Sequence, residues 1–115
     1  MAKVARRLTW RDVLRFSGSG ASRATVRRYY DLYRREVGIP RRCDNVNCMF
    51  HTGDPQWNGQ TLPLILDHVS GVSRDNSPQN LRLLCPSCDA QLMTRGGLNK
   101  GRVQVSSGGY AIKRR

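Results

Sequence analysis

Hydrophobic positions recur at two different spacings along the chain, and each spacing predicts a different element. Between Ser22 and Gly38, valines and tyrosines recur every three or four residues, which predicts a helix with its arginines largely on other faces. Ser22 is a suitable cap for the start of this helix, and Gly38 followed by Pro40 is expected to end it. The hydrophobic positions of this helix are Val26, Tyr29, Tyr30, Tyr33 and Val37.

A shorter helix is expected ahead of it, because Thr9 followed by Asp12 is typical of a helix start, and it would extend to Arg15. The stretch SGSGAS then interrupts the helical pattern. Two short helices joined by a glycine-containing turn, the second rich in arginine, are compatible with a helix-turn-helix-like DNA-binding unit. They are equally compatible with a helical hairpin that packs on the core and contributes only its charge.

In the centre of the chain the hydrophobic residues of the range 62–66 are nearly continuous, which predicts a short buried strand. A second strand is expected to start at Asn80 and to end at Cys85. Pro86 and the polar residues behind it predict a helix from about Ser87. The centre is therefore expected to contain two strands followed by a helix.

Asp67 and His68 lie at the end of the first of these strands. Neighbouring side chains of a regular strand point to opposite faces, so the two residues share a site only if the strand loses its regularity there. The turn signal at Ser70 and Gly71 favours that loss.

The C-terminal residues 100–115 have glycine and serine at their centre and KRR at their end, which predicts a mobile tail. The alternative is a small hairpin around SSGG, because hydrophobic residues alternate on both sides of that stretch. These hydrophobic residues are Val103, Val105, Tyr110 and Ile112.

A length of 115 residues suits one small domain with a modest core, which gains from an additional staple. The chain has no apolar run near twenty residues, and its N-terminus carries charges without an apolar segment behind them. We therefore expect a soluble, cytoplasmic protein without a membrane partner.

The four cysteines form a C-x4-C pair, Cys43 and Cys48, and a C-x2-C pair, Cys85 and Cys88. Two such pairs are typical of a tetrahedral structural zinc site, and in a reducing compartment they favour metal over disulfides. A secreted chain would reverse that preference. His51 is a possible replacement for one cysteine, but a complete four-cysteine set makes it a loop residue instead.

The net charge of +12 indicates a polyanionic partner, for which nucleic acid is the commonest candidate. The charge is unevenly distributed: residues 1–42 hold twelve Lys and Arg against three acids, and residues 43–99 hold three against five. Residues 100–115 add five basic residues and no acid. Basic flanks can neutralise phosphates while a carboxylate-bearing centre holds a cation, which favours a nuclease over a merely soluble charged surface.

The centre resembles the HNH endonuclease family, in the stretches WNGQTLPLILDHVSG, NSPQNLRLLCPSC and RGGLN within about 43–99. The resemblance implies an α+β fold: a ββα-metal module stapled by a four-cysteine zinc site and preceded by a small helical region. It divides the chain into a basic helical region (1–40), a nuclease domain (41–99) and a basic tail (100–115). It also favours a bacterial or phage-encoded protein.

In this resemblance Asp67 matches the first ligand of the catalytic metal, His68 the general base, and Asn80 the asparagine that orients the histidine. Asp89 departs from the pattern, because the common small members have histidine directly after the last cysteine. A carboxylate suits Mg²⁺ or Mn²⁺, so Asp89 is expected to replace that histidine as the second metal ligand.

These roles imply a metal-dependent endonuclease that hydrolyses DNA phosphodiester bonds. The resemblance to the family implies products with 5′-phosphate and 3′-hydroxyl ends. The alternative is a catalytically inactive zinc-ribbon DNA-binding protein. The sequence leaves open whether the protein is a monomer or a homodimer, and which DNA sequence it would cut. The residues expected to contact DNA are Arg23, Arg27, Arg28, Arg82, Arg95, Lys100 and Arg102.

Overall fold

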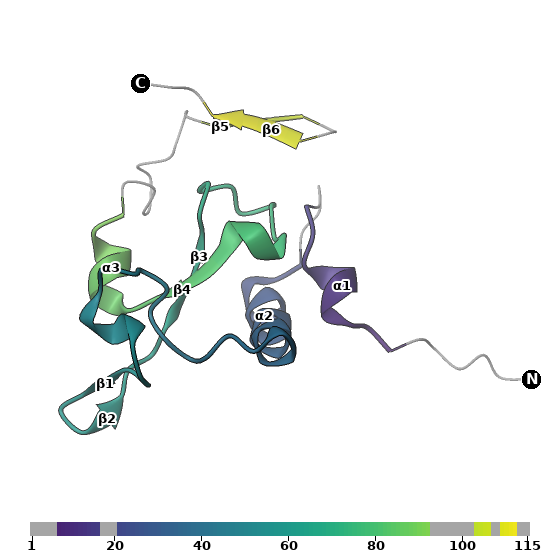
Figure 1. Cartoon of the computed structure of the whole chain (residues 1–115). Coiled ribbons are helices and arrows are strands. Elements are labelled where there is room, and N and C mark those ends of the chain that lie inside the picture. The colour runs from purple at the N-terminus through teal and green to yellow at the C-terminus, as the bar shows by residue number, and fades with distance from the viewer. Residues whose placement is uncertain (1–6, 17–20, 93–102, 107–108, 113–115) are drawn as a thin grey trace, which may run out of the picture.

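A computed structural model describes residues 7–16, 21–92, 103–106 and 109–112 of the chain (Figure 1). Within these ranges, helices occur together with small antiparallel sheets, as expected of an α+β chain. No helix among the described residues is long and apolar enough to cross a membrane.

Both predicted N-terminal helices form, although the first ends at Val13 and not at the expected Arg15. Helix α1 spans Trp10–Val13, and the carboxylate of Asp12 accepts hydrogen bonds from the backbone N–H of Thr9 (2.8 Å) and from its hydroxyl (3.2 Å). Helix α2 spans Arg23–Val37 and begins at Ser22, whose hydroxyl accepts from the Thr25 N–H at 3.2 Å. It ends at Gly38, which adopts a left-handed conformation with φ of 84° and bonds back to the last turn.

The segment between the helices and the central sheet contains a hairpin that the hydrophobic pattern did not indicate. A 3₁₀ turn, η1, covers Met49–His51, and strands β1 (Gln56–Trp57) and β2 (Gln60–Thr61) then pair antiparallel. Asn58 and Gly59 join the two strands with φ of 52° and 76°. An Asn-Gly pair is the strongest short hairpin signal because both positions require positive φ, so the sequence WNGQ did carry this information.

Strand β3 (Ile65–His68) and strand β4 (Leu81–Leu84) pair antiparallel, and β4 leads directly into α3 (Pro86–Ala90). The expected loss of strand regularity does not occur. Asp67 is opposite Arg82 and His68 is opposite Leu81, so both residues lie within the paired strand. Asn80 precedes the second strand as the last residue of a 3₁₀ turn, η2 (Pro78–Asn80).

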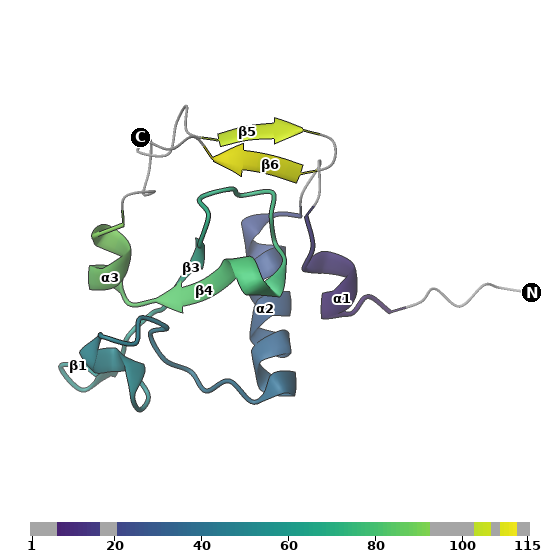
Figure 2. The same ribbon diagram turned by 45° about the horizontal axis from the view of Figure 1, so that its top comes forward.

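One hydrophobic core joins the helical region to the central strands. Val26 and Tyr30 of α2 belong to the same buried cluster as Leu66 of β3 and Leu83 of β4, and Cys43 and Cys85 are also members. The β3–β4 hairpin lies between α2 on one side and α3 on the other (Figures 1 and 2). Helix α2 therefore packs on the centre of the protein. A helix-turn-helix-like role of the two helices in DNA binding stays a prediction.

The C-terminal hairpin corrects the expectation of a mobile tail. Strand β5 (Val103–Ser106) pairs antiparallel with β6 (Gly109–Ile112), in a register that sets Val103 opposite Ile112. The alternation of hydrophobic residues was thus the better guide than the glycine and serine content.

Candidate metal centre and adjoining Asp-His site

The four cysteines gather into one cluster, although they come from distant parts of the chain. All four are free, and their sulfur atoms lie within 4.8 Å of one another. The turn ahead of η1 carries Cys43 and Cys48, and the end of β4 and the first turn of α3 carry Cys85 and Cys88. Among the described residues this is the one group of three or more metal-ligating side chains drawn together.

The geometry of the cluster fits a tetrahedral zinc ion. Four sulfurs each about 2.3 Å from a central Zn²⁺ are about 3.8 Å apart, which follows from tetrahedral geometry. The Sγ atoms of Cys48 and Cys85 are separated by 3.8 Å. This distance is far longer than the S–S bond of a disulfide, about 2.05 Å, so the donor set fits a metal rather than an oxidised pair.

Hydrogen bonds from the surrounding chain orient the sulfurs. The backbone N–H groups of Phe50 and Cys85 donate to Cys48 and Cys43 at 3.4 and 3.3 Å, and the Asn45 amide donates to Cys88 at 3.4 Å. Such donors favour a negatively charged sulfur, which is the form that binds metal.

The thiols differ in acidity because their surroundings differ. Burial raises the pKa of Cys88 to about 12, with further contributions from Cys48 and Cys85, and burial also raises the pKa of Cys43. Burial acts in the same direction on Cys85, but hydrogen bonds with Cys88 and with the other two cysteines together outweigh it and lower the Cys85 pKa. Metal binding therefore has to displace protons from the cluster.

His51 lies beside the cluster without joining it. Its Nδ1 atom is 2.9 Å from the carbonyl oxygen of Cys43, and the cluster consists of cysteines alone. His51 is thus outside the cysteine set, as expected, but it is the last residue of the 3₁₀ turn η1 and not a loop residue.

Asp67 makes a close ion pair across the hairpin. The Arg82 Nε donates to Asp67 Oδ2 at 2.6 Å, as the direct opposition of the two residues in the strand register allows. The Asp67 side chain is 11% exposed, whereas the Arg82 side chain is 32% exposed. Arg82, expected from the sequence to contact DNA, is thus bonded to a residue expected to hold the metal.

The side chain that contacts His68 is Asn76, not Asn80. His68 Nε2 lies 2.7 Å from Asn76 Oδ1, and Asn76 is only 2% exposed. Because an amide oxygen only accepts hydrogen bonds, Nε2 is the donor in this contact, and a neutral ring then carries its lone pair on Nδ1. Asn76 therefore selects the tautomer of His68.

Asn80 organises the loop between the two strands. Its side-chain oxygen accepts from the Ser70 N–H at 3.0 Å, and its amide donates to the Asp75 carbonyl at 2.8 Å. Its own carbonyl accepts from the Val69 N–H at 2.8 Å. These contacts hold both ends of the loop that presents Asn76 to His68.

Asp89 lies in the first turn of α3, one residue after Cys88, and is half-buried. Its backbone N–H bonds to the Cys85 carbonyl at 3.0 Å, and α3 contacts both β3 and β4. The helix start is thus fixed by the cysteines and packed on the hairpin that carries Asp67 and His68. The described residues do not bring Asp67, His68 and Asp89 into a second metal-ligating group like that of the cysteines.

The arginines expected to contact DNA have different surroundings. Arg23 donates to the carbonyl of Leu66, and Arg27 donates to the carbonyl of Leu64. Arg28 lies over the ring of Tyr29, with its guanidinium carbon 5.7 Å from the ring centre. The remaining basic positions of that prediction, Arg95, Lys100 and Arg102, lie outside the residues whose side chains the structure describes.

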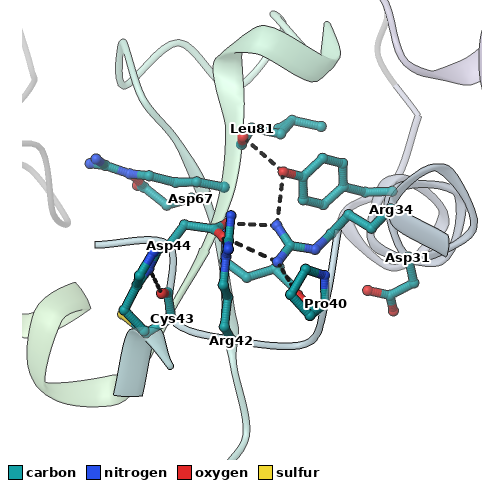
Figure 3. A network of polar contacts seen from close by, with 12 residues as sticks. Asp31, Arg34, Pro40, Arg42, Cys43, Asp44, Asp67 and Leu81 are labelled. Atoms are coloured by element: carbon teal, nitrogen blue, oxygen red, sulfur yellow. Dashed lines mark hydrogen bonds and ion pairs between the residues drawn. The ribbon is translucent and has the colours of Figure 1, made fainter. Parts of the chain in front are cut away.

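A buried polar network that the sequence pattern did not reveal connects α2 to the cysteine turn (Figure 3). Arg34 donates to Asp44 from both terminal nitrogens, at 2.6 and 3.1 Å, and to the Pro40 carbonyl at 2.9 Å. Burial alone would lower the pKa of Arg34, but its hydrogen bonds to Asp44 and Tyr30 hold that pKa above its usual value. Helical periodicity placed Arg34 away from the core, yet it is 4% exposed.

The same network reaches the outer edge of β4. Asp44 Oδ2 accepts from the Leu83 N–H at 2.7 Å, and the Asp44 N–H donates to the Leu83 carbonyl at 2.7 Å. The Tyr30 hydroxyl donates to the Leu81 carbonyl at 2.9 Å, and burial raises the pKa of this phenol. No sequence motif marks Asp44, because its partners Arg34 and Leu83 come from distant parts of the chain.

Comparison with known proteins found a relative that is named an endonuclease. The H-N-H endonuclease F-TflIV of Escherichia phage T5 is 36% identical over 63 residues, which make up 55% of this chain and 25% of the relative. The chain thus spans about a quarter of the length of that protein. No family model and no solved structure matches the chain. Over half of its length the chain is therefore similar to an HNH endonuclease, and the resemblance expected from its sequence is confirmed.

Proposed function

We propose that this protein is a metal-dependent HNH endonuclease that hydrolyses phosphodiester bonds in DNA. The observation that carries the proposal is the way the Asp-His pair is tied to the cysteine cluster. Strand β3 bears Asp67 and His68, pairs in register with β4, and β4 runs directly into Cys85 and α3. The order of two paired strands and one helix supports a ββα-metal module, and the phage relative named an H-N-H endonuclease supports the reaction class.

His68 is the general base in this proposal. Its contact with Asn76 leaves Nδ1 as the basic atom of the neutral ring, and Nδ1 takes a proton from the attacking water. The buried Asn76 holds the ring in place during the transfer, so little reorganisation accompanies it. Asn80 acts through the loop that it braces rather than on His68 directly.

Asp67 and Asp89 are the proposed protein ligands of a catalytic Mg²⁺ or Mn²⁺. Their carboxylate oxygens are the donors that these hard cations prefer, and α3 packs on both strands beside them. A divalent ion bound there would supply positive charge to the phosphate and leaving-group oxygens. The ion pair with Arg82 occupies Oδ2 of Asp67, so a cation competes with this guanidinium for the carboxylate.

The zinc ion has a separate, structural role in the proposal. Cys43, Cys48, Cys85 and Cys88 form a closed four-sulfur set, which leaves no position for substrate. We expect about one tightly held zinc per chain, measured by elemental analysis. Replacing Cys85 with serine is expected to unfold the centre of the protein, because the cluster ties the turn ahead of η1 to the start of α3.

The division into a helical region, a nuclease domain and a basic tail stays a prediction, as do DNA as the partner and the cytoplasm as the location. In this proposal the basic flanks neutralise phosphates while the centre cuts. The shared core of α2 and the hairpin means that the helical region also supports the nuclease part.

Incubation of supercoiled plasmid with the pure protein and Mg²⁺ or Mn²⁺ tests the function. The wild type is expected to produce nicked or linear DNA, whereas His68→Ala should bind DNA and retain zinc without cutting. A strong chelator is not a sufficient control, because it would also remove the structural zinc. If no divalent ion supports cutting by zinc-loaded wild type, the proposed activity is wrong.

A DNA-binding protein without catalysis is the second candidate, favoured by the aspartate at position 89 and by the Asp67–Arg82 ion pair. The nuclease proposal expects Asp89→Ala to abolish cutting with zinc content unchanged. It expects Asp89→His to retain cutting and to shift the preference toward softer divalent ions. Should Asp89→His cut while the wild type does not, the aspartate is a disabling change and the second candidate is correct.

A further inference from the structure

Helix α2 borders a groove in which arginine is the commonest lining residue. A cavity of about 290 Å³ is lined by polar residues and by two apolar ones, Ile39 and Leu83. The polar lining residues are Arg27, Asp31, Arg34 and Arg35 of the helix and Arg41 beyond it. A second cavity of about 520 Å³ adjoins it along α2, because Arg27, Asp31 and Arg35 line both. Ala24, Arg28 and Leu32 complete the second cavity. Asp31 is the one acid in either lining, so the groove is suited to an anion.

Three of the lining arginines are already bonded within the protein. Arg27 pairs with Asp31 at 3.2 Å and donates to the Leu64 carbonyl. Arg34 pairs with Asp44 at 2.6 Å, and Arg41 pairs with Asp54 at 2.9 Å. These arginines shape the groove, but their charges are largely balanced by neighbouring acids.

Arg28 and Arg35 are different, because neither has an ion pair among the described residues and both are exposed. They are seven positions apart on α2, so they point in nearly the same direction and are separated by about 10.5 Å along the helix axis. Each arginine also has a long, flexible side chain, so the two guanidinium groups can reach two different phosphates.

We propose that the groove along α2 binds the phosphate backbone of duplex DNA through Arg28 and Arg35. This inference rests on the proposed function for the identity of the nucleic acid. It divides the arginines of α2 by role: Arg23 and Arg27 bond to the strand that carries Asp67, whereas Arg28 and Arg35 contact the substrate. The contacts are to phosphate, so they position the duplex without reading its sequence.

Fluorescence anisotropy with a labelled DNA duplex tests the inference, with His68→Ala in every protein so that the DNA stays intact. The comparison is between the parent, the double variant Arg28→Ala/Arg35→Ala, and Arg15→Ala/Arg74→Ala as a matched control. The control removes the same two charges from exposed positions outside the groove. Zinc content and melting temperature of all three proteins show that the fold is unchanged.

The groove variant should lose affinity about tenfold or more at low salt, and the slope of log K against log salt should become shallower by about 2, since each phosphate contact contributes about 0.9. The control should keep both values, and Arg28→Lys/Arg35→Lys should restore most of the slope because it restores the charge. Equal losses in the groove variant and the control would mean that only net charge matters, and would overturn the proposal. So would an effect confined to an RNA duplex.

The result is independent of catalysis. If zinc-loaded wild type cuts no DNA but the groove variant shows the weaker affinity and the shallower salt slope, the groove proposal is supported and the nuclease proposal fails. If the wild type cuts and the groove variant binds as tightly as the parent at every salt concentration, the groove proposal fails and the nuclease proposal stands.

Discussion

At the scale of single residues, the orientation of His68 depends on a side chain eight positions further along the chain. Asn76 is 2% exposed and contacts Nε2 at 2.7 Å. The stretch RDNSPQN contains two asparagines, and spacing alone does not say which of them reaches the histidine. That choice follows from the path of the loop, which Asn80 fixes through Ser70 and Asp75.

Asn76→Ala should lower the rate of DNA cutting about tenfold to a hundredfold, because His68 loses the contact that sets its tautomer. Asn76→Asp should keep most of the rate, since a carboxylate accepts the same hydrogen bond from Nε2. The measurement is the initial rate of plasmid nicking at equal zinc content. Equal rates for Asn76→Ala and the wild type would show that Asn76 does not position the base.

At the scale of elements, both outer edges of the two-stranded hairpin are covered by side chains from elsewhere. Arg23 and Arg27 bond to the Leu66 and Leu64 carbonyls on the β3 side, and Tyr30 bonds to the Leu81 carbonyl on the β4 side. A two-stranded sheet is marginal alone, and its unpaired edge groups invite pairing with other chains. The covered edges allow the small hairpin to persist next to the site.

Asp44→Ala should lower the free energy of unfolding by about 3–5 kcal/mol, because it leaves the buried Arg34 without its partner. The Arg34 and Asp44 side chains are 5% and 14% exposed. The exposed pair Arg41–Asp54 is the matched control, and Asp54→Ala should cost about 0–1 kcal/mol. Denaturant unfolding of the zinc-loaded proteins measures both values. Similar costs for the two variants would contradict a structural role of the buried pair.

Some elements were predictable because a local signal determines them. The limits of α2 follow from the cap at Ser22 and the left-handed Gly38, both readable in the sequence. The limits of β3 do not, because pairing with β4 and not hydrophobicity sets them: Leu62 and Leu64 lie before the strand, whereas the polar Asp67 and His68 lie inside it. The cysteine cluster was predictable from spacing, but the burial of Arg34 depends on Asp44 from a different segment.

In the molecule as a whole, the helical region and the cysteine-bearing centre share one hydrophobic core. Val26, Tyr30 and Arg34 of α2 are 2%, 3% and 4% exposed, and Tyr30 bonds to β4. The charge distribution along the chain separates a basic flank from an acidic centre, but it does not predict which residues pack together. The charge pattern of the sequence therefore did not indicate that these two regions share a core.

Removing residues 1–38 should destabilise the remaining chain and lower its affinity for zinc. The core would lose the buried residues of α2, and Asp44 would lose its ion-pair partner Arg34. The check is thermal unfolding and zinc content of residues 39–115 beside the full chain. A truncated chain that melts at the same temperature and holds one zinc would contradict the shared core.

The central claim is that the Asp-His pair, held beside the cysteine cluster, is a nuclease site in which His68 is the base. Single-turnover cleavage of a labelled DNA duplex with saturating protein and Mg²⁺ or Mn²⁺ tests it most directly, with zinc content and DNA affinity measured on the same preparations. We expect His68→Ala to cut about 10²–10⁴ times more slowly than the wild type, with zinc content and DNA affinity unchanged. Equal rates for the two proteins, or no cleavage by the wild type with either ion, would contradict it.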